Sequence, residues 1–149
     1  MRRSTHAKIA RDRRGAAALE CAVVMMPLLL FLMGAVEYGR FLFVRNLAEN
    51  ASREAARFAV VRTNDQTTAQ VQAVATNMMA GQSSALSGMT ISVFKADPVT
   101  GNNLGSWTDA RFGQGIAVRI TGTYQPMIPL VMRNPITIQT TSVMLSEAN

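Results

Sequence analysis

The chain has 149 residues, of which 48% are hydrophobic and only 16% are charged, and its formal net charge is +6. This length suits one domain and one additional segment, and so little charge excludes a disordered tail protein. Residues 1–14 hold six of the 15 Lys and Arg residues and one of the nine acids, so this arm alone carries +5. Nucleic-acid-binding proteins spread their cations over a folded face. We therefore predict no nucleic-acid partner.

A long apolar segment follows the basic arm. Residues 16–36 contain Glu20 as their only charge, and they reach the roughly 20 residues that a helix needs to span a bilayer. The Lys- and Arg-rich flank predicts a cytoplasmic N-terminus. We therefore predict a basic cytoplasmic leader over residues 1–15, a transmembrane helix in contact with membrane lipid over 16–36, an amphipathic extension of the same helix over 37–62, and a periplasmic or extracellular domain over 63–149.

Two alternatives to a retained anchor exist for the apolar segment. A cleaved signal peptide needs small residues at the end of its apolar stretch, where this chain has Met33. A lipoprotein signal needs its cysteine after the apolar stretch, but Cys21, the only cysteine, opens it. A retained transmembrane anchor is the favoured interpretation.

Glu20 lies where an ionised carboxylate is costly unless it is paired. One explanation places it at the membrane interface, where it reaches lipid headgroups. The other begins with cleavage after Gly15. The new amine of Ala16 would then stand one helical turn before Glu20 on the same face, and the carboxylate could neutralise that amine in its own or a neighbouring chain.

The residues around this acid resemble a known pattern. A basic leader, Gly15, four small or apolar residues, Glu20 and a long apolar helix form the type IV prepilin arrangement. The continuation resembles the TadE-like family of tight-adherence (Flp) pilus proteins, over about residues 13–62. Three short motifs are the basis of this resemblance: Pro27-Leu28-Leu29, Glu37-Tyr38-Gly39-Arg40, and Ala51-Ser52-Arg53-Glu54-Ala55-Ala56-Arg57. The chain differs in having Cys21 where the family usually has an aromatic residue.

The resemblance implies cleavage after Gly15 by a prepilin peptidase at the bacterial inner membrane. It further implies a minor pilin or pseudopilin-like subunit that acts in adhesion or secretion. Its partners would be other pilin-like subunits and inner-membrane pilus assembly proteins. Two alternatives stay open: an uncleaved single-pass anchor that presents a periplasmic binding module, and a type II secretion pseudopilin.

Beyond the membrane, apolar residues recur in steps of three and four. They are Phe41, Val44, Ala48, Ala51, Ala55 and Phe58. This rhythm predicts a packed seam on one helix that runs from about Ala17 to Arg62, with a kink at Pro27 and a second candidate kink at Gly34. The seam packs either on the chain's own sheet, which we favour, or against neighbouring subunits.

The distal part predicts a small α+β domain. Asn64-Asp65 indicates a helix break and cap, followed by a short helix that Gly81 closes and a loop through Gly88. A period of two then predicts an antiparallel sheet of about three strands. These strands are residues 89–93, 116–121 and 136–145. In the last strand the apolar positions switch from even to odd near Thr140, which a bulge or an edge position would explain.

The residues that carry chemistry do not form a catalytic pattern. His6 is the only histidine, which excludes a His-based triad or zinc site in the distal domain. Asp97, Asn102, Asn103 and Asp109 could gather around a calcium ion, but their spacing is not that of an EF-hand, and turn formation explains them better. We predict no metal, no cofactor, no small-molecule substrate and no enzymatic activity.

Two further apolar features lie in the distal part. Trp107 is either a surface contact or, as we favour, a buried anchor. The link from Met127 to Met132, broken by Pro126 and Pro129, predicts core or membrane-proximal packing rather than a ligand groove.

Overall fold

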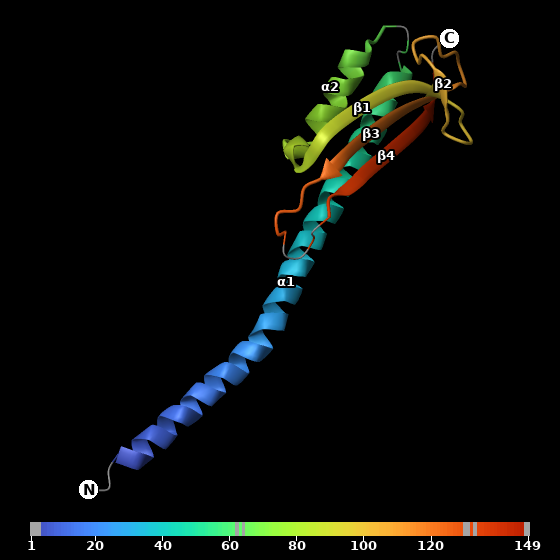
Figure 1. The fold of residues 1–149 in the computed structure, drawn as a ribbon. Coiled ribbons are helices and arrows are strands. Elements are labelled where there is room, and N and C mark those ends of the chain that lie inside the picture. The colour runs from blue at the N-terminus through green and yellow to red at the C-terminus, as the bar shows by residue number, and fades with distance from the viewer. Residues whose placement is uncertain (1–3, 62, 64, 130–131, 133, 148–149) are drawn as a thin grey trace.

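The computed structural model describes residues 4–61, 63, 65–129, 132 and 134–147, with side chains from residue 15 on. A single long helix projects from a small domain that is built on its C-terminal half (Figure 1). The elements are α1 (Ser4–Val61), α2 (Thr68–Met78), a 3-10 turn (Gln82–Ala85), β1 (Leu86–Ala96), β2 (Asn103–Gly105), β3 (Gly115–Tyr124) and β4 (Ile136–Leu145). The predicted α+β class is confirmed. A fourth, three-residue strand joins the three that were expected.

Helix α1 has 58 residues, which corresponds to about 87 Å. It begins at Ser4, so the predicted start near Ala17 is wrong. Residues 4–14 contain neither Pro nor Gly, and a helix propagates through such a stretch once it has been nucleated. The helix also continues through Pro27, and Figure 1 shows one unbroken, gently curved helix rather than a sharp kink.

Helix α2 begins with a capping box one turn after the position predicted for its cap. The side chain of Thr67 accepts a hydrogen bond from the Gln70 amide at 3.3 Å, and the Gln70 side chain accepts one from the Thr67 amide at 2.8 Å. These two bonds satisfy amides that a helix start leaves unpaired. The prediction that Asn64-Asp65 caps α2 is therefore wrong, and Asn64 itself lies outside the described residues. The prediction that Gly81 closes α2 is wrong: the helix ends at Met78 with Met79 as its C-cap, and Gly81, with a left-handed φ of 77°, stands before the 3-10 turn.

The sheet is antiparallel throughout, in the order β2-β1-β3-β4. Strand β1 starts at Leu86, inside the stretch for which we predicted a loop through Gly88. Its pairing with β3 shifts between Ser87 and Thr90, and Gly88 has a φ of 63° at this point. A glycine with positive φ allows such a bulge, so the strand continues where the small residues suggest a loop.

Strand β4 forms an edge of the sheet and pairs with β3 without a register shift. The edge position, and not a bulge, therefore accompanies the change in its apolar pattern. Thr140 and Ser142 face α1, where they contact the Ala48 carbonyl at 3.4 Å and the Ser52 hydroxyl at 2.8 Å. Val143 packs against the opposite face of the sheet. Small hydroxyl residues thus occupy positions where the helix comes close to the strand.

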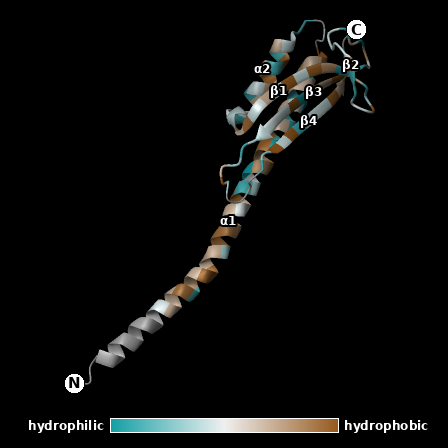
Figure 2. Cartoon of the chain, in the orientation of Figure 1, coloured by the Kyte–Doolittle hydropathy of each residue, from teal (hydrophilic) through white to brown (hydrophobic). Residues whose placement is uncertain are grey.

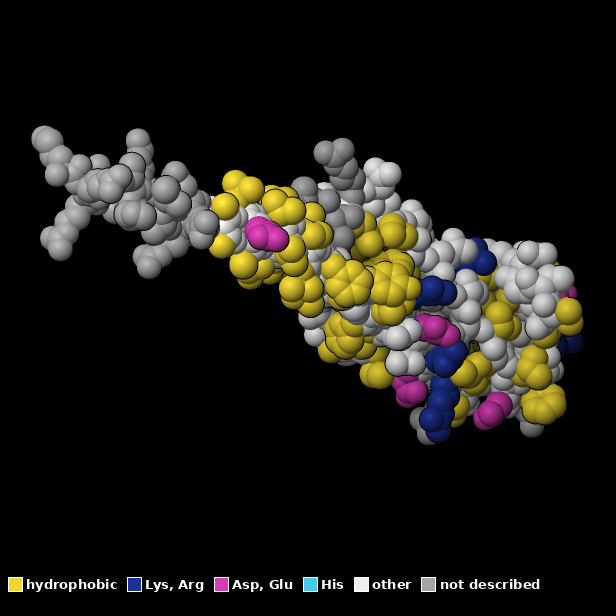
Figure 3. All heavy atoms as spheres, turned by 90° about the horizontal axis from the view of Figure 1, so that it is seen from below, with side chains coloured by type: hydrophobic (Ala, Val, Ile, Leu, Met, Phe, Trp, Pro, Cys, Tyr) yellow, Lys and Arg dark blue, Asp and Glu magenta, His cyan; other side chains and the backbone are white. Residues whose placement is uncertain are grey.

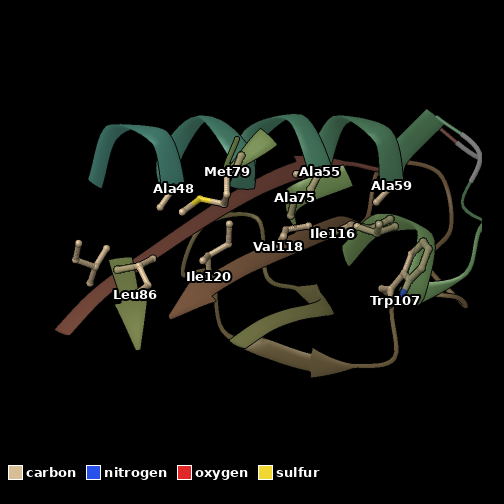
Figure 4. Packing of buried hydrophobic residues seen from close by; sticks show 14 of the residues in the cluster. Ala48, Ala55, Ala59, Ala75, Met79, Leu86, Trp107, Ile116, Val118 and Ile120 are labelled. Carbon is tan, nitrogen blue, oxygen red and sulfur yellow. The ribbon is translucent and has the colours of Figure 1, made fainter. Parts of the chain in front are cut away.

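The main core lies between the two helices and one face of the sheet, as Figure 4 shows. Alanines of α1 face the large apolar side chains of β3, and α2 adds further apolar side chains from the side. The α1 and β3 members that Figure 4 labels are Ala48, Ala55, Ala59, Ile116, Val118 and Ile120. Trp107 is 2% exposed, and its indole nitrogen donates to the Thr68 hydroxyl at 2.9 Å. The prediction that Trp107 is a buried anchor is confirmed.

Candidate membrane anchor and assembly site

Helix α1 divides into two parts that differ in exposure. Every side chain from Gly15 to Met33 is exposed, although most of them are apolar. Within the described residues, α1 is long and apolar enough to cross a membrane. From Glu37 on, one face of the same helix is buried under the domain. Figure 2 shows hydrophobic residues along this projecting stretch, and in Figure 3 most of the visible charged side chains lie over the domain.

The residues of the predicted processing site lie on the projecting part. Gly15, Ala16 and Glu20 are all helical and exposed. Among the described residues, the Glu20 carboxylate forms no hydrogen bond or ion pair, and its neighbours Leu19 and Val23 are exposed apolar residues. Ala16 and Glu20 stand one helical turn apart, so they share a face. Gly15 costs the helix about 1 kcal/mol relative to alanine, which makes α1 locally weak at this point.

The predicted seam lies against the chain's own domain. Val44, Ala48, Ala51 and Ala55 are fully buried. Phe41 and Phe58 are partly buried and pack against the same core. Of the two arrangements that the sequence allows, packing on the chain's own sheet is the one observed in the structure.

A buried carboxylate marks the boundary between the two parts of α1. Glu37 is only 1% exposed. It accepts hydrogen bonds from the Tyr124 hydroxyl at 2.7 Å and from the backbone amides of Met127 and Ile128 at 3.2 and 3.0 Å. These contacts tie the end of β3 and the segment after it to α1. We call residues 125–129 the β3–β4 loop segment.

Arg40 completes this cluster on the next turn of α1. Its guanidinium donates to the Tyr124 hydroxyl and to the Gln125 carbonyl, both at 3.3 Å. Burial by itself raises the pKa of Glu37, but the three hydrogen bonds and the positive charge of Arg40 outweigh burial, so this pKa is lower than usual. Burial and the neighbouring carboxylate raise the pKa of Tyr124, so its hydroxyl remains a donor.

The pattern of the sequence does not mark Glu37 as a site residue. Glu37 and Arg40 are notable there only as part of the family resemblance. One local signal was available. Glu37 is an acid directly after the apolar segment, and the only basic residue within one helical turn of it is Arg40. Because its main partner, Tyr124, is 87 residues away, no local spacing could reveal the contact.

Two of the four residues of the possible calcium site, Asp97 and Asn103, cap turns. Asp97 accepts hydrogen bonds from the amides of Thr100 and Val99 at 2.7 and 2.9 Å, and these bonds lower its pKa. The Asn103 side chain accepts one from the Gly105 amide, and Asp109 pairs with Lys95. Within the described part of the chain, no three His, Cys, Asp or Glu side chains gather in a metal-binding group.

These features define a membrane-anchored protein whose small α+β domain is built on the same helix that provides the anchor. Residues 15–57 match the family described as TadE-like protein. The resemblance to this family is therefore confirmed over the segment from the predicted cleavage site through most of the buried seam, and it indicates a protein associated with the tight-adherence (Flp) pilus. No curated protein matches the chain, and no solved structure does.

Proposed function

We propose that the protein is a minor pilin or pseudopilin-like structural component of a tight-adherence pilus. It is processed after Gly15 by a prepilin peptidase at the bacterial inner membrane and acts by subunit assembly in adhesion or secretion rather than by catalysis. The leader faces the cytoplasm, and the domain faces the periplasm or the cell exterior.

The observation that carries this proposal is the division of α1. A subunit that leaves the bilayer to join an assembly needs an apolar helix that its own domain does not cover, because neighbouring helices must replace the lipid around it. Residues 15–33 are exposed along their whole length, while the domain holds the helix firmly from Glu37 on. The family match to residues 15–57 includes both parts.

Glu20 is the residue proposed to register neighbouring subunits. Cleavage after Gly15 creates an amine on Ala16, one turn before this carboxylate and on the same face of the helix. An exposed acid in apolar surroundings is costly without a partner. The amine, in the same chain or in a neighbouring one, removes that cost once the subunits assemble.

The intact mass of the protein extracted from membranes tests the processing step. We expect a chain that begins at Ala16. A Gly15→Lys variant should keep residues 1–15, because its bulky side chain blocks a site that accepts glycine. A wild-type chain that retains these residues contradicts the proposal and favours the uncleaved anchor that presents a periplasmic module.

A Glu20→Gln variant tests the assembly step. We expect normal removal of the leader but reduced incorporation into sheared pili, measured by immunoblot of the pilus and membrane fractions. Glu54→Gln is the matched control, because Glu54 is an exposed acid of the same helix outside the apolar segment. Full incorporation of the Glu20→Gln variant would refute the pairing with the amine.

A further inference from the structure

We propose that the β3–β4 loop segment, residues 125–129, inserts into the interfacial layer of the membrane beside α1, so that the domain rests on the lipid surface. This inference relies on α1 as a membrane anchor but not on cleavage after Gly15. The occupant of this surface is phospholipid at the boundary between headgroups and acyl chains.

The first argument is position. The apolar residues 16–36 match the hydrocarbon thickness of about 30 Å at 1.5 Å per residue. The last of them, Val36, is 67% exposed, and the next residue, Glu37, binds the amides of Met127 and Ile128. The loop segment is therefore held at the level where the apolar part of α1 ends.

The thickness of the interfacial layer supports the same placement. Headgroup regions add about 5–8 Å on each side of the hydrocarbon core, which corresponds to about three to five residues of helix. The turn of α1 after Val36 and the loop segment fall within this layer. Tyr38, on that turn, is 56% exposed, and tyrosine is enriched at membrane interfaces. In Figure 3, hydrophobic side chains continue from the projecting helix onto the near end of the domain.

The second argument is the chemistry of the loop segment. Residues 124–132 contain no charged side chain, and the side chain of Met127 is 70% exposed. A charge-free segment with an exposed methionine at this level fits an apolar or interfacial environment better than bulk water.

The third argument is the hydrogen bonding of the backbone amides. Pro126 and Pro129 have no N–H group. The amides of Met127 and Ile128 are bound by Glu37, and the Gln125 amide donates to the Ala85 carbonyl at 3.1 Å. Every backbone N–H of the segment is thus absent or already paired within the protein. An unpaired N–H would make entry into a water-poor layer costly, and this segment does not incur that cost.

The test uses the chain as extracted from membranes that contain the prepilin peptidase, reconstituted into vesicles of phosphatidylcholine and phosphatidylglycerol. In a Cys21→Ser background, Met127→Cys is labelled with an environment-sensitive NBD fluorophore. Val99→Cys is the matched control, because Val99 is 93% exposed and belongs to the turn after β1. Circular dichroism of each labelled protein verifies that the fold is retained.

We expect blue-shifted emission from the probe at position 127 and stronger quenching by a spin label near the headgroup end of the acyl chain than by one near its methyl end. The probe at position 99 should show neither effect. Emission at position 127 equal to that at position 99 overturns the proposal. A blue shift without quenching by either lipid also overturns it, because the segment would then contact a neighbouring protein subunit.

The same measurement on the Gly15→Lys variant separates this inference from the proposed processing. Lipid quenching at position 127 that persists when residues 1–15 are retained shows that membrane docking does not depend on cleavage. Loss of quenching in the uncleaved variant overturns the claim that the anchor alone places the segment.

Discussion

At the scale of single residues, Glu37 is the charge that organises the base of the domain. A buried carboxylate is costly unless hydrogen bonds and a nearby opposite charge compensate for lost hydration. Here three donors and the guanidinium of Arg40 supply that compensation. These donors and Arg40 therefore keep Glu37 ionised. The same hydrogen bonds hold the loop segment against α1.

Glu37→Gln should lower the free energy of unfolding by about 2 kcal/mol, since hydrogen bonds to a charged group are replaced by weaker neutral ones. Chemical denaturation of the full chain in detergent micelles measures this change. The matched control, Glu54→Gln on the same helix, should alter the stability by less than about 0.5 kcal/mol. Equal effects of the two variants would contradict the role assigned to Glu37.

The lowered pKa of Glu37 also predicts how stability depends on pH. Below the usual glutamate value of about 4.5 the unfolded chain binds a proton that the folded chain still excludes. The stabilisation from this group is therefore fully present above that pH and is lost as the pH falls through the lowered folded-state value. Asp97 acts in the same direction, so the difference between wild type and Glu37→Gln in a series of acidic denaturation curves isolates Glu37. An equal pH dependence of the free energy of unfolding in wild type and Glu37→Gln would contradict this assignment.

At the scale of elements, the buried alanines of α1 let the helix lie close to β3 and β4. Ala51 and Ala55 are both 0% exposed, and close-packed interiors have no room for a longer side chain. Small residues on this face are therefore a packing requirement of the domain.

Ala51→Glu or Ala55→Glu should destabilise the domain by more than about 4 kcal/mol, because each buries an unpaired charge in a filled core. Asn50→Glu adds the same charge at an exposed position of α1 and should be nearly neutral. Protein abundance in membranes and thermal unfolding measure the effect. Normal abundance and stability of both alanine variants would mean that this face is not packed as described.

Substitution by alanine at two glycines on different elements should change the stability of the protein in opposite directions. Gly115→Ala places a methyl group against the Ala96 carbonyl oxygen of the neighbouring strand, which should destabilise the sheet by about 1–3 kcal/mol. Gly39→Ala meets no atom within 4 Å and should stabilise α1 by up to about 1 kcal/mol. The two melting temperatures should move apart, and a shift in the same direction would contradict the packing around Gly115.

At the scale of the whole molecule, one continuous helix serves as both anchor and core element. The exposed residues 15–33 contribute nothing to the domain core, while one face of α1 from Glu37 on forms part of that core. A change of position within the membrane is therefore transmitted directly to the domain, because no flexible linker separates the two parts of α1.

This division predicts which fragments fold. Residues 35–149 should form a soluble domain that unfolds cooperatively, because the fragment keeps Glu37 and the buried face of α1. Residues 48–149 should be much less stable, since they lack Glu37 and the fully buried Val44. Circular dichroism melts of the two fragments test this. Equal stability of the two fragments would show that residues 35–47 of α1 are dispensable for folding.

Local patterns in the sequence predicted most of the elements. Periods of 3.6 and two located α1, α2 and the three long strands, because each repeat reports which face meets the core. The residues at which the helices and strands begin and end were less predictable. A basic leader gives no signal for where a helix starts, and a loop of small residues conceals a bulge at Gly88 that depends on pairing with β3. Strand β2 has three exposed residues and therefore no apolar period.

The apolar anchor, the exposed acid within it and the spacing between Gly15 and Glu20 follow from the order of residues along one helix, so local pattern is enough to find them. That the seam faces the chain's own sheet and that Glu37 binds Tyr124 and the loop segment follow from the packing of distant elements. Such contacts join residues far apart in the chain, and a periodic face does not specify what covers it. The partner of each buried group is set by how the elements pack together, and that packing is a property of the whole fold.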